Sequence, residues 1–234
     1  DSACRAAFPH LREELQAVMA RIDQGVTVAV IDPSSGRTVE VRPTRGLVAE
    51  GIRFLMYGKG GADLPRQIHA AAQGDLKTLV KTALDRRKAL DDVLAMGMFL
   101  SVTCAEDLPF ITADMARRAT AGTLLGDYRI AQQKRACTAW PRGDIPRDAH
   151  ELVRSDVPVL LLSGERDPVT PPEFGERVAK PLRHGLHLVV PRGGHGGEGA
   201  CVQAIERQFL AKASVQGLDT SCLRATPPTR FNVG

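Results

Sequence analysis

Apolar residues recur at helical spacing through most of the first 133 residues. In residues 8–22, for example, Leu11, Leu15, Val18 and Ile22 fall on one side of a helix, which predicts an amphipathic helix with one buried face. The same spacing predicts further helices over residues 47–57, 64–72, 76–94, 112–133 with an interruption near Gly126, and 200–213. The first part of the chain is therefore predicted to be mainly helical.

Two shorter patterns interrupt these helices. Residues 25–31 and 38–41 are rich in valine and flank the turn sequence Asp-Pro-Ser-Ser-Gly at 32–36, which predicts a β-hairpin. Residues 98–102 form a short apolar run, which we interpret as a strand or extended link that leads to a loop carrying Cys104.

Two further apolar runs lie in the last part of the chain. Residues 157–163 are a short, mostly apolar run, as expected of a strand that is buried on both faces of a parallel sheet. Residues 186–190 are a second strand candidate. Gly164 and the prolines that follow it end the first strand, and they favour a helix that begins near Glu173. The pattern predicts an α/β fold.

Each of these two strands is followed by a loop with a chemically active side chain. Asp167 follows the first strand, and His195 lies in the glycine-rich loop 191–197 after the second. Open α/β sheets place their chemistry at the carboxyl ends of the strands. A carboxylate and an imidazole that meet there can act as the acid and base of a catalytic triad. His184 and His187 are interpreted as ordinary positions around the second strand.

No nucleophile accompanies this pair. The Gly-x-Ser-x-Gly elbow of α/β-hydrolases is absent from all 234 residues, Ser34 and Ser35 lie in the hairpin turn, and Ser163 lies inside a predicted strand. In α/β-hydrolases the serine precedes the acid and the histidine along the chain. We therefore expect the serine to be supplied from outside this chain.

Composition argues against nucleic-acid binding, a membrane span and a zinc site. The net charge is +4, and basic pairs are spread along the predicted helices, which favours solvated faces over a nucleic-acid surface. No run approaches the roughly 18 apolar residues that span a bilayer. The five cysteines contain no Cys-x-x-Cys, which argues against a zinc site. We expect no metal, no cofactor, no nucleic acid partner and no membrane span.

A series of short motifs extends along nearly the whole chain. They are Cys4-Arg-Ala-Ala-Phe-Pro9, Gly97-Met-Phe-Leu-Ser-Val-Thr-Cys104-Ala-Glu106-Asp107, Cys137-Thr-Ala-Trp140-Pro141, Gly164-Glu-Arg-Asp167-Pro-Val-Thr-Pro171, Gly194-His195-Gly196, Cys201 and Leu218-Asp-Thr-Ser-Cys222. In this order and spacing they resemble the tripeptidyl aminopeptidase-like (TAP-like) family of α/β-hydrolases, which are relatives of the prolyl aminopeptidases.

The resemblance implies a partial α/β-hydrolase fold. Residues 1–150 would form a mostly helical cap, or lid, and residues 151–234 the last strands and helices of the hydrolase core. Asp167 would be the triad acid and His195 the triad base. Glu106 would be a cap glutamate that holds the free α-amino group of the substrate, although without the resemblance it is interpreted as a solvated or helix-capping carboxylate.

The resemblance also implies two disulfides. They pair Cys104 with Cys137 and Cys201 with Cys222, and this pairing leaves Cys4 without a disulfide partner. Because disulfides are typical of exported proteins, we expect a secreted or periplasmic protein. The alternative is five buried thiols in a cytosolic chain.

Together these features predict the cap and C-terminal half of a serine hydrolase. We expect an exopeptidase that releases short N-terminal peptides or amino acids, with the upstream half supplied by a companion chain or a neighbouring subunit. Two alternatives remain: a carboxylesterase of the same fold that acts on an ester substrate, and a non-catalytic truncated hydrolase that acts as a binding protein.

Overall fold

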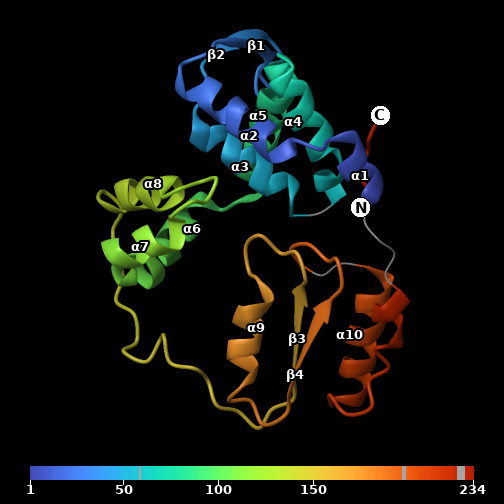
Figure 1. The fold of residues 1–234 in the computed structure, drawn as a ribbon. Helices are drawn as coiled ribbons and strands as arrows, with labels where there is room; N and C mark the ends of the chain where they lie inside the picture. Colours follow the sequence, from blue (N-terminus) through green and yellow to red (C-terminus); the bar gives the residue numbers. More distant parts are fainter. Residues whose placement is uncertain (58, 197–198, 226–229) are drawn as a thin grey trace. The chain divides into compact units, whose positions relative to one another are not determined.

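The computed structural model describes residues 1–57, 59–196, 199–225 and 230–234, so Gly197 of the predicted histidine loop lies outside the described residues (Figure 1). The chain divides into two compact units. We call His10–Ile52 with Gln67–His150 the helical unit, and Asp1–Pro9 with Arg53–Arg66 and Glu151–Gly234 the sheet unit.

The first part of the helical unit contains the predicted amphipathic helices. The helices are α2 (Leu11–Asp23), α3 (Arg45–Leu55), α4 (Leu64–Ala72) and α5 (Leu76–Val93), and the last residues of α3 and the first of α4 belong to the sheet unit. The predicted hairpin is confirmed as β1 (Val28–Ile31) paired antiparallel with β2 (Thr38–Val41), and β1 packs against α5. The core of this part contains Val18, Met19, Ile22, Val30, Val48, Leu79 and Val80.

The second part of the helical unit corrects one prediction. Residues 98–102 are not a strand or an extended link, because they belong to helix α6 (Met96–Val102). The chain continues into a π-helix, Thr103–Asp107, so Cys104 lies on a helical turn and not on a loop. Helical geometry lets Leu100 pack beside the buried Cys104 in a small apolar cluster, and this tertiary packing is absent from the local pattern.

Two short helices complete the helical unit. The predicted helix over residues 112–133 is divided into α7 (Ala113–Thr120) and α8 (Tyr128–Cys137), and the break lies near Gly126 as expected.

Among the described residues, no single helix is long and apolar enough to cross a membrane. Leu76–Val93 and Met96–Phe110, which are bent by 85° relative to each other, reach the length and apolar composition of a membrane span only when they are taken together.

The sheet unit is built around two parallel strands. It begins with the short helix α1 (Ser2–Ala7). Strand β3 (Val159–Gly164) pairs in parallel with β4 (Gly185–Val190), and α9 (Pro172–Ala179) connects them. Helix α10 (Ala200–Lys212) follows β4. Helices α9 and α10 lie on opposite sides of the strands (Figure 1).

Alternate residues of the two strands face different helices. Leu160, Leu162 and Leu188 pack with Val202 and Ile205 of α10, whereas α9 contacts both strands from the other side. The expectation that the first strand is buried on both faces is wrong for residues 159–162, which are only half-buried. In the described part of the chain, β3 pairs with β4 alone, so no further strand covers its outer edge.

Both disulfides that the resemblance implies are present. Cys104 is bonded to Cys137 in the helical unit, and Cys201 to Cys222 in the sheet unit, whereas Cys4 is not disulfide-bonded. In the chain-entropy account, closing loops of these lengths contributes about 3–4 kcal/mol each to the free energy of unfolding. Two disulfides indicate an oxidising environment. The division into a cap over residues 1–150 and a hydrolase core over 151–234 stays a prediction.

Candidate active site

The acid and the base candidates occupy neighbouring loops of the sheet unit. Asp167 lies on the loop after β3, and His195 lies on the loop after β4. Because β3 and β4 are parallel and adjacent, both loops leave the same end of the sheet. The structure therefore brings the two predicted site residues together.

Backbone hydrogen bonds join the two loops. The N–H of Glu165 donates to the carbonyl of Val190 at 3.0 Å, and the N–H of Arg166 donates to the carbonyl of Gly193 at 2.8 Å. This approach requires glycine at Gly164, since a Cβ there would lie 2.6 Å from the Gly193 carbonyl oxygen. The contact with the histidine loop thus explains the glycine at the end of β3.

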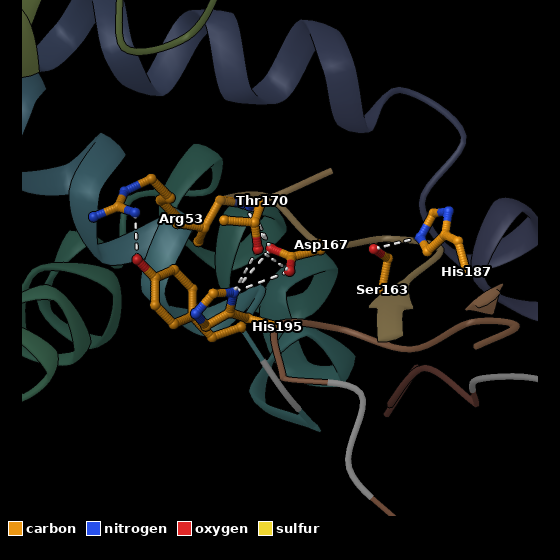
Figure 2. A network of polar contacts seen from close by, with 8 residues as sticks. Arg53, Ser163, Asp167, Thr170, His187 and His195 are labelled. Atoms are coloured by element: carbon orange, nitrogen blue, oxygen red, sulfur yellow. Dashed lines mark hydrogen bonds and ion pairs between the residues drawn. The ribbon is translucent and has the colours of Figure 1, made fainter. Parts of the chain in front are cut away.

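Asp167 and His195 are joined by a direct hydrogen bond (Figure 2). Nδ1 of His195 lies 2.9 Å from Oδ2 and 3.1 Å from Oδ1 of Asp167. Because an ionised carboxylate only accepts hydrogen bonds, Nδ1 carries the proton and donates it. The Asp167 side chain is 3% exposed and that of His195 is 39% exposed. A buried acid therefore orients an accessible imidazole whose Nε2 is the remaining basic nitrogen.

Three further hydrogen bonds hold the Asp167 carboxylate. Oδ1 accepts from the backbone N–H of Val169 at 2.8 Å and of Thr170 at 3.0 Å, and Oδ2 accepts from the Thr170 hydroxyl at 2.7 Å. Burial by itself raises the pKa of Asp167, but the hydrogen bonds from Thr170, Val169 and His195 outweigh it and hold the pKa below its usual range. The carboxylate is consequently ionised at neutral pH.

The lowered pKa of Asp167 predicts an acid-dependent stability. The ionised group stabilises the fold above its unfolded-state pKa of about 4, and this stabilisation is lost as the pH falls through the lower folded-state pKa. We expect Asp167→Asn to reduce the free energy of unfolding most at neutral pH, with the difference from the wild type shrinking in acid. Urea unfolding measured from neutral pH to about pH 3 tests this. A difference that stays constant over that range would contradict it, and the exposed Asp144→Asn serves as the control.

Comparison with known proteins agrees with this geometry. Residues 122–222 match the family model of the TAP-like proteins, and both Asp167 and His195 lie within the matched residues. The matched segment belongs to the TAP-like family of α/β-hydrolases. The TAP-like segment also contains Cys137, Cys201 and Cys222, three of the four disulfide-bonded cysteines.

A curated protein that is similar to this chain is named as an esterase. Over 180 residues, the chain is 27% identical to a pimeloyl-[acyl-carrier protein] methyl ester esterase from Neisseria meningitidis serogroup A. The match covers 72% of this chain and 53% of the esterase, so the chain spans about half the length of this curated relative. No solved structure matches the chain significantly. Together, the family and the relative support a hydrolase.

Glu106, the third predicted site residue, lies in the helical unit. It is on the π-helix Thr103–Asp107, and its side chain is exposed. Asp167 and His195 lie in the sheet unit instead, so only these two of the three residues are brought into contact within one unit. The role of Glu106 as an amine anchor stays a prediction.

Another histidine, His187, contacts a serine, Ser163, away from the contact between Asp167 and His195 (Figure 2). Nε2 of His187 and Oγ of Ser163 are 2.8 Å apart on neighbouring strands. Ser163 is only 9% exposed, and a Cβ added to Gly175 of α9 would touch both side chains. The pair therefore fills the space between the strands and α9. In the described part of the chain, His195 contacts Asp167 and Thr170 but no serine hydroxyl.

Two residues of the candidate site were not predicted from the sequence. Thr170 completes the hydrogen bonding of Asp167, and the Asp-x-x-Thr spacing could have revealed it because such side chains commonly bond the backbone two or three residues away. Tyr57 accepts a hydrogen bond from the His195 backbone, and no local signal points to it. The described residues contain no group of three or more histidine, cysteine or acidic side chains that could hold a metal ion.

Proposed function

We propose that this chain forms the cap and C-terminal part of a serine hydrolase whose nucleophilic serine lies outside these 234 residues. Asp167 is the acid and His195 is the base. The observation that carries the proposal is the contact between a buried, ionised Asp167 and an accessible His195 at the carboxyl ends of two parallel strands. In this proposal the sheet unit is part of a larger α/β-hydrolase core, with residues 1–150 as the cap and 151–234 as the end of the core.

The geometry of the pair suits acyl transfer. Nε2 of His195 takes the proton of the serine hydroxyl as the serine oxygen attacks the acyl carbon of the substrate. The imidazolium that results is stabilised by Asp167, which keeps its negative charge. His195 then gives the proton to the leaving amine or alkoxide, and a water molecule repeats the sequence to release the acid.

The substrate is proposed to be a peptide with a free N-terminus. The exposed carboxylate of Glu106 suits a role as anchor for a substrate ammonium group, as the TAP-like resemblance implies. An exopeptidase with this anchor would release short N-terminal peptides or amino acids.

A carboxylesterase is the second candidate function. It is favoured by the relative from Neisseria meningitidis, whose name describes a methyl ester esterase. The same acid and base would serve both reactions, because peptide and ester cleavage share the acyl-enzyme route.

A companion for the sheet unit is part of the proposal. Residues 159–162 of β3 are half-buried, and β3 pairs with β4 alone in the described residues. An open strand edge next to apolar side chains favours pairing with another strand. The upstream half of the hydrolase, from a companion chain or a neighbouring subunit, would supply that strand and the serine. The two disulfides support a secreted or periplasmic location.

Labelling with a fluorophosphonate serine probe tests the proposal. The protein purified from its natural source, with any chain that accompanies it, is labelled, and the adduct is located by mass spectrometry. We expect the adduct on a serine outside the 234 residues. An adduct on Ser163 or on another serine of this chain would contradict the missing nucleophile. Absence of any adduct would instead support a non-catalytic binding protein.

A further inference from the structure

Tyr57 meets the candidate base from a distant part of the sequence. It belongs to the segment Arg53–Arg66, which is part of the sheet unit. Its backbone carbonyl accepts a hydrogen bond from the N–H of His195 at 2.9 Å. Its ring centroid lies 5.1 Å from that of His195, with an angle of 53° between the ring planes. Tyr57 thus contacts both the backbone and the imidazole of His195.

The histidine loop is shaped to accept this approach. A Cβ on Gly194 would collide with the carbonyl oxygen of Tyr57 and lie 3.4 Å from that of Met56. Because these are backbone atoms, rotation of a side chain could not relieve the collision. The glycine before His195 therefore allows the backbone of residues 56–57 to lie directly against the loop.

Arg53 holds Tyr57 from its other end. The guanidinium donates a hydrogen bond to the Tyr57 hydroxyl. The central guanidinium carbon lies 5.2 Å from the Tyr57 ring centroid and 4.5 Å from that of Phe54. A cation at these distances from aromatic faces is attracted to both rings. The half-buried Tyr57 ring therefore has fixed partners at the hydroxyl and at one face.

Asp167 alone leaves the imidazole incompletely fixed. It restrains one nitrogen of a side chain that is 39% exposed, on a loop whose glycines add backbone freedom. A base must be held in an orientation that brings Nε2 to the substrate, since small displacements reduce the rate. The carbonyl of Tyr57 fixes the backbone of His195, and its ring limits the tilt of the imidazole.

We propose that Tyr57 is a positioning residue for His195, and that Arg53 acts through Tyr57 by orienting its ring. The assignment rests on the proposed role of His195 as the base. Tyr57 takes no proton in this proposal. Its effect is on the orientation and tautomer of His195.

Nitrogen-detected NMR of the histidine side chains tests this in the full protein. Long-range proton–nitrogen spectra report the tautomer and ring environment of His195 over a pH series. We expect the wild type to show one neutral tautomer with the proton on Nδ1. Tyr57→Leu should shift the His195 ring signals and mix the two tautomers, whereas the same signals of His187 stay in place. Tyr128→Leu, which removes a tyrosine ring from the helical unit, is the control.

The readout separates this inference from the proposed function, because it requires no hydrolysis. Unchanged His195 signals in Tyr57→Leu, with the wild-type circular dichroism spectrum, would overturn the inference. If that variant loses its circular dichroism signal, Tyr57→Phe decides, since it removes only the hydroxyl that accepts from Arg53. Shifted or broadened His195 signals in Tyr57→Phe would support the inference, and unchanged signals would overturn it.

Discussion

Replacement of His195 by alanine is expected to lower kcat of the complete hydrolase by about 10⁴- to 10⁶-fold, as observed when members of such triads are removed. In the proposed mechanism, the His195 imidazole takes the proton of the serine and returns it to the leaving group, and the variant lacks this group. Initial rates on an aminopeptide and on an ester substrate measure the effect. Both substrates should be affected alike, because the proton transfer is common to both reactions.

The matched control is His184→Ala. His184 is an exposed histidine just before β4, and its replacement should leave the rate close to that of the wild type. A double variant that combines Asp167→Asn with His195→Ala should lose little more than His195→Ala alone, since residues that act as a unit are not additive. Wild-type turnover by His195→Ala would remove the assignment of the base.

Replacement of Gly164 by alanine is expected to lower the free energy of unfolding by about 1–3 kcal/mol or more. The new methyl group would meet the carbonyl oxygens of Gly193 and Gly194. These are backbone atoms, so the loops after β3 and β4 would have to move apart. Urea unfolding of the purified protein measures the loss, and the Asp167 to His195 contact should weaken with it.

Gly61→Ala serves as the control for this variant. It lies in the same unit, and a Cβ there would make ordinary contacts, 3.6 Å from the carbonyl oxygen of Leu55 and 3.9 Å from Cα of Met56. Its stability should stay within about 0.5 kcal/mol of the wild type. Equal stability of Gly164→Ala and Gly61→Ala would contradict the role of the close approach between the two loops.

The local sequence predicted helices well where apolar residues kept helical spacing over two or more turns. The helix over 64–72 agrees with α4, and that over 76–94 agrees with α5, whose N-cap Asp75 accepts a hydrogen bond from the Lys77 backbone. The run 98–102 was assigned wrongly, because a short apolar run has no periodicity that separates strand from helix. Packing around Cys104 and Cys137 accompanies the helical form there, and that contact is not visible locally.

The positions of Asp167 and His195 could be predicted from the sequence, because the order of the strands determines where the loops after them lie. Asp167 and His195 each follow a strand, so parallel pairing alone places them at one end of the sheet. Tyr57 contacts His195 through a backbone carbonyl and a ring face. A backbone acceptor is common to every residue, so its partner depends on the tertiary fold and leaves no trace in the residue type.

Asp167 and His195, the proposed acid and base, belong to one continuous β-α-β unit, from β3 through α9 to the loop after β4. Their contact therefore closes a loop within one unit, and its entropic cost is lower than that of joining more remote segments by about 0.6 kcal/mol for each halving of loop length. Contacts between residues near in sequence also favour rapid folding. The proposed base can thus meet Asp167 during folding of this unit, whereas its contact with Tyr57 forms once residues 53–66 pack against the loop. In the proposed assembly, joining the upstream half would then be a docking step.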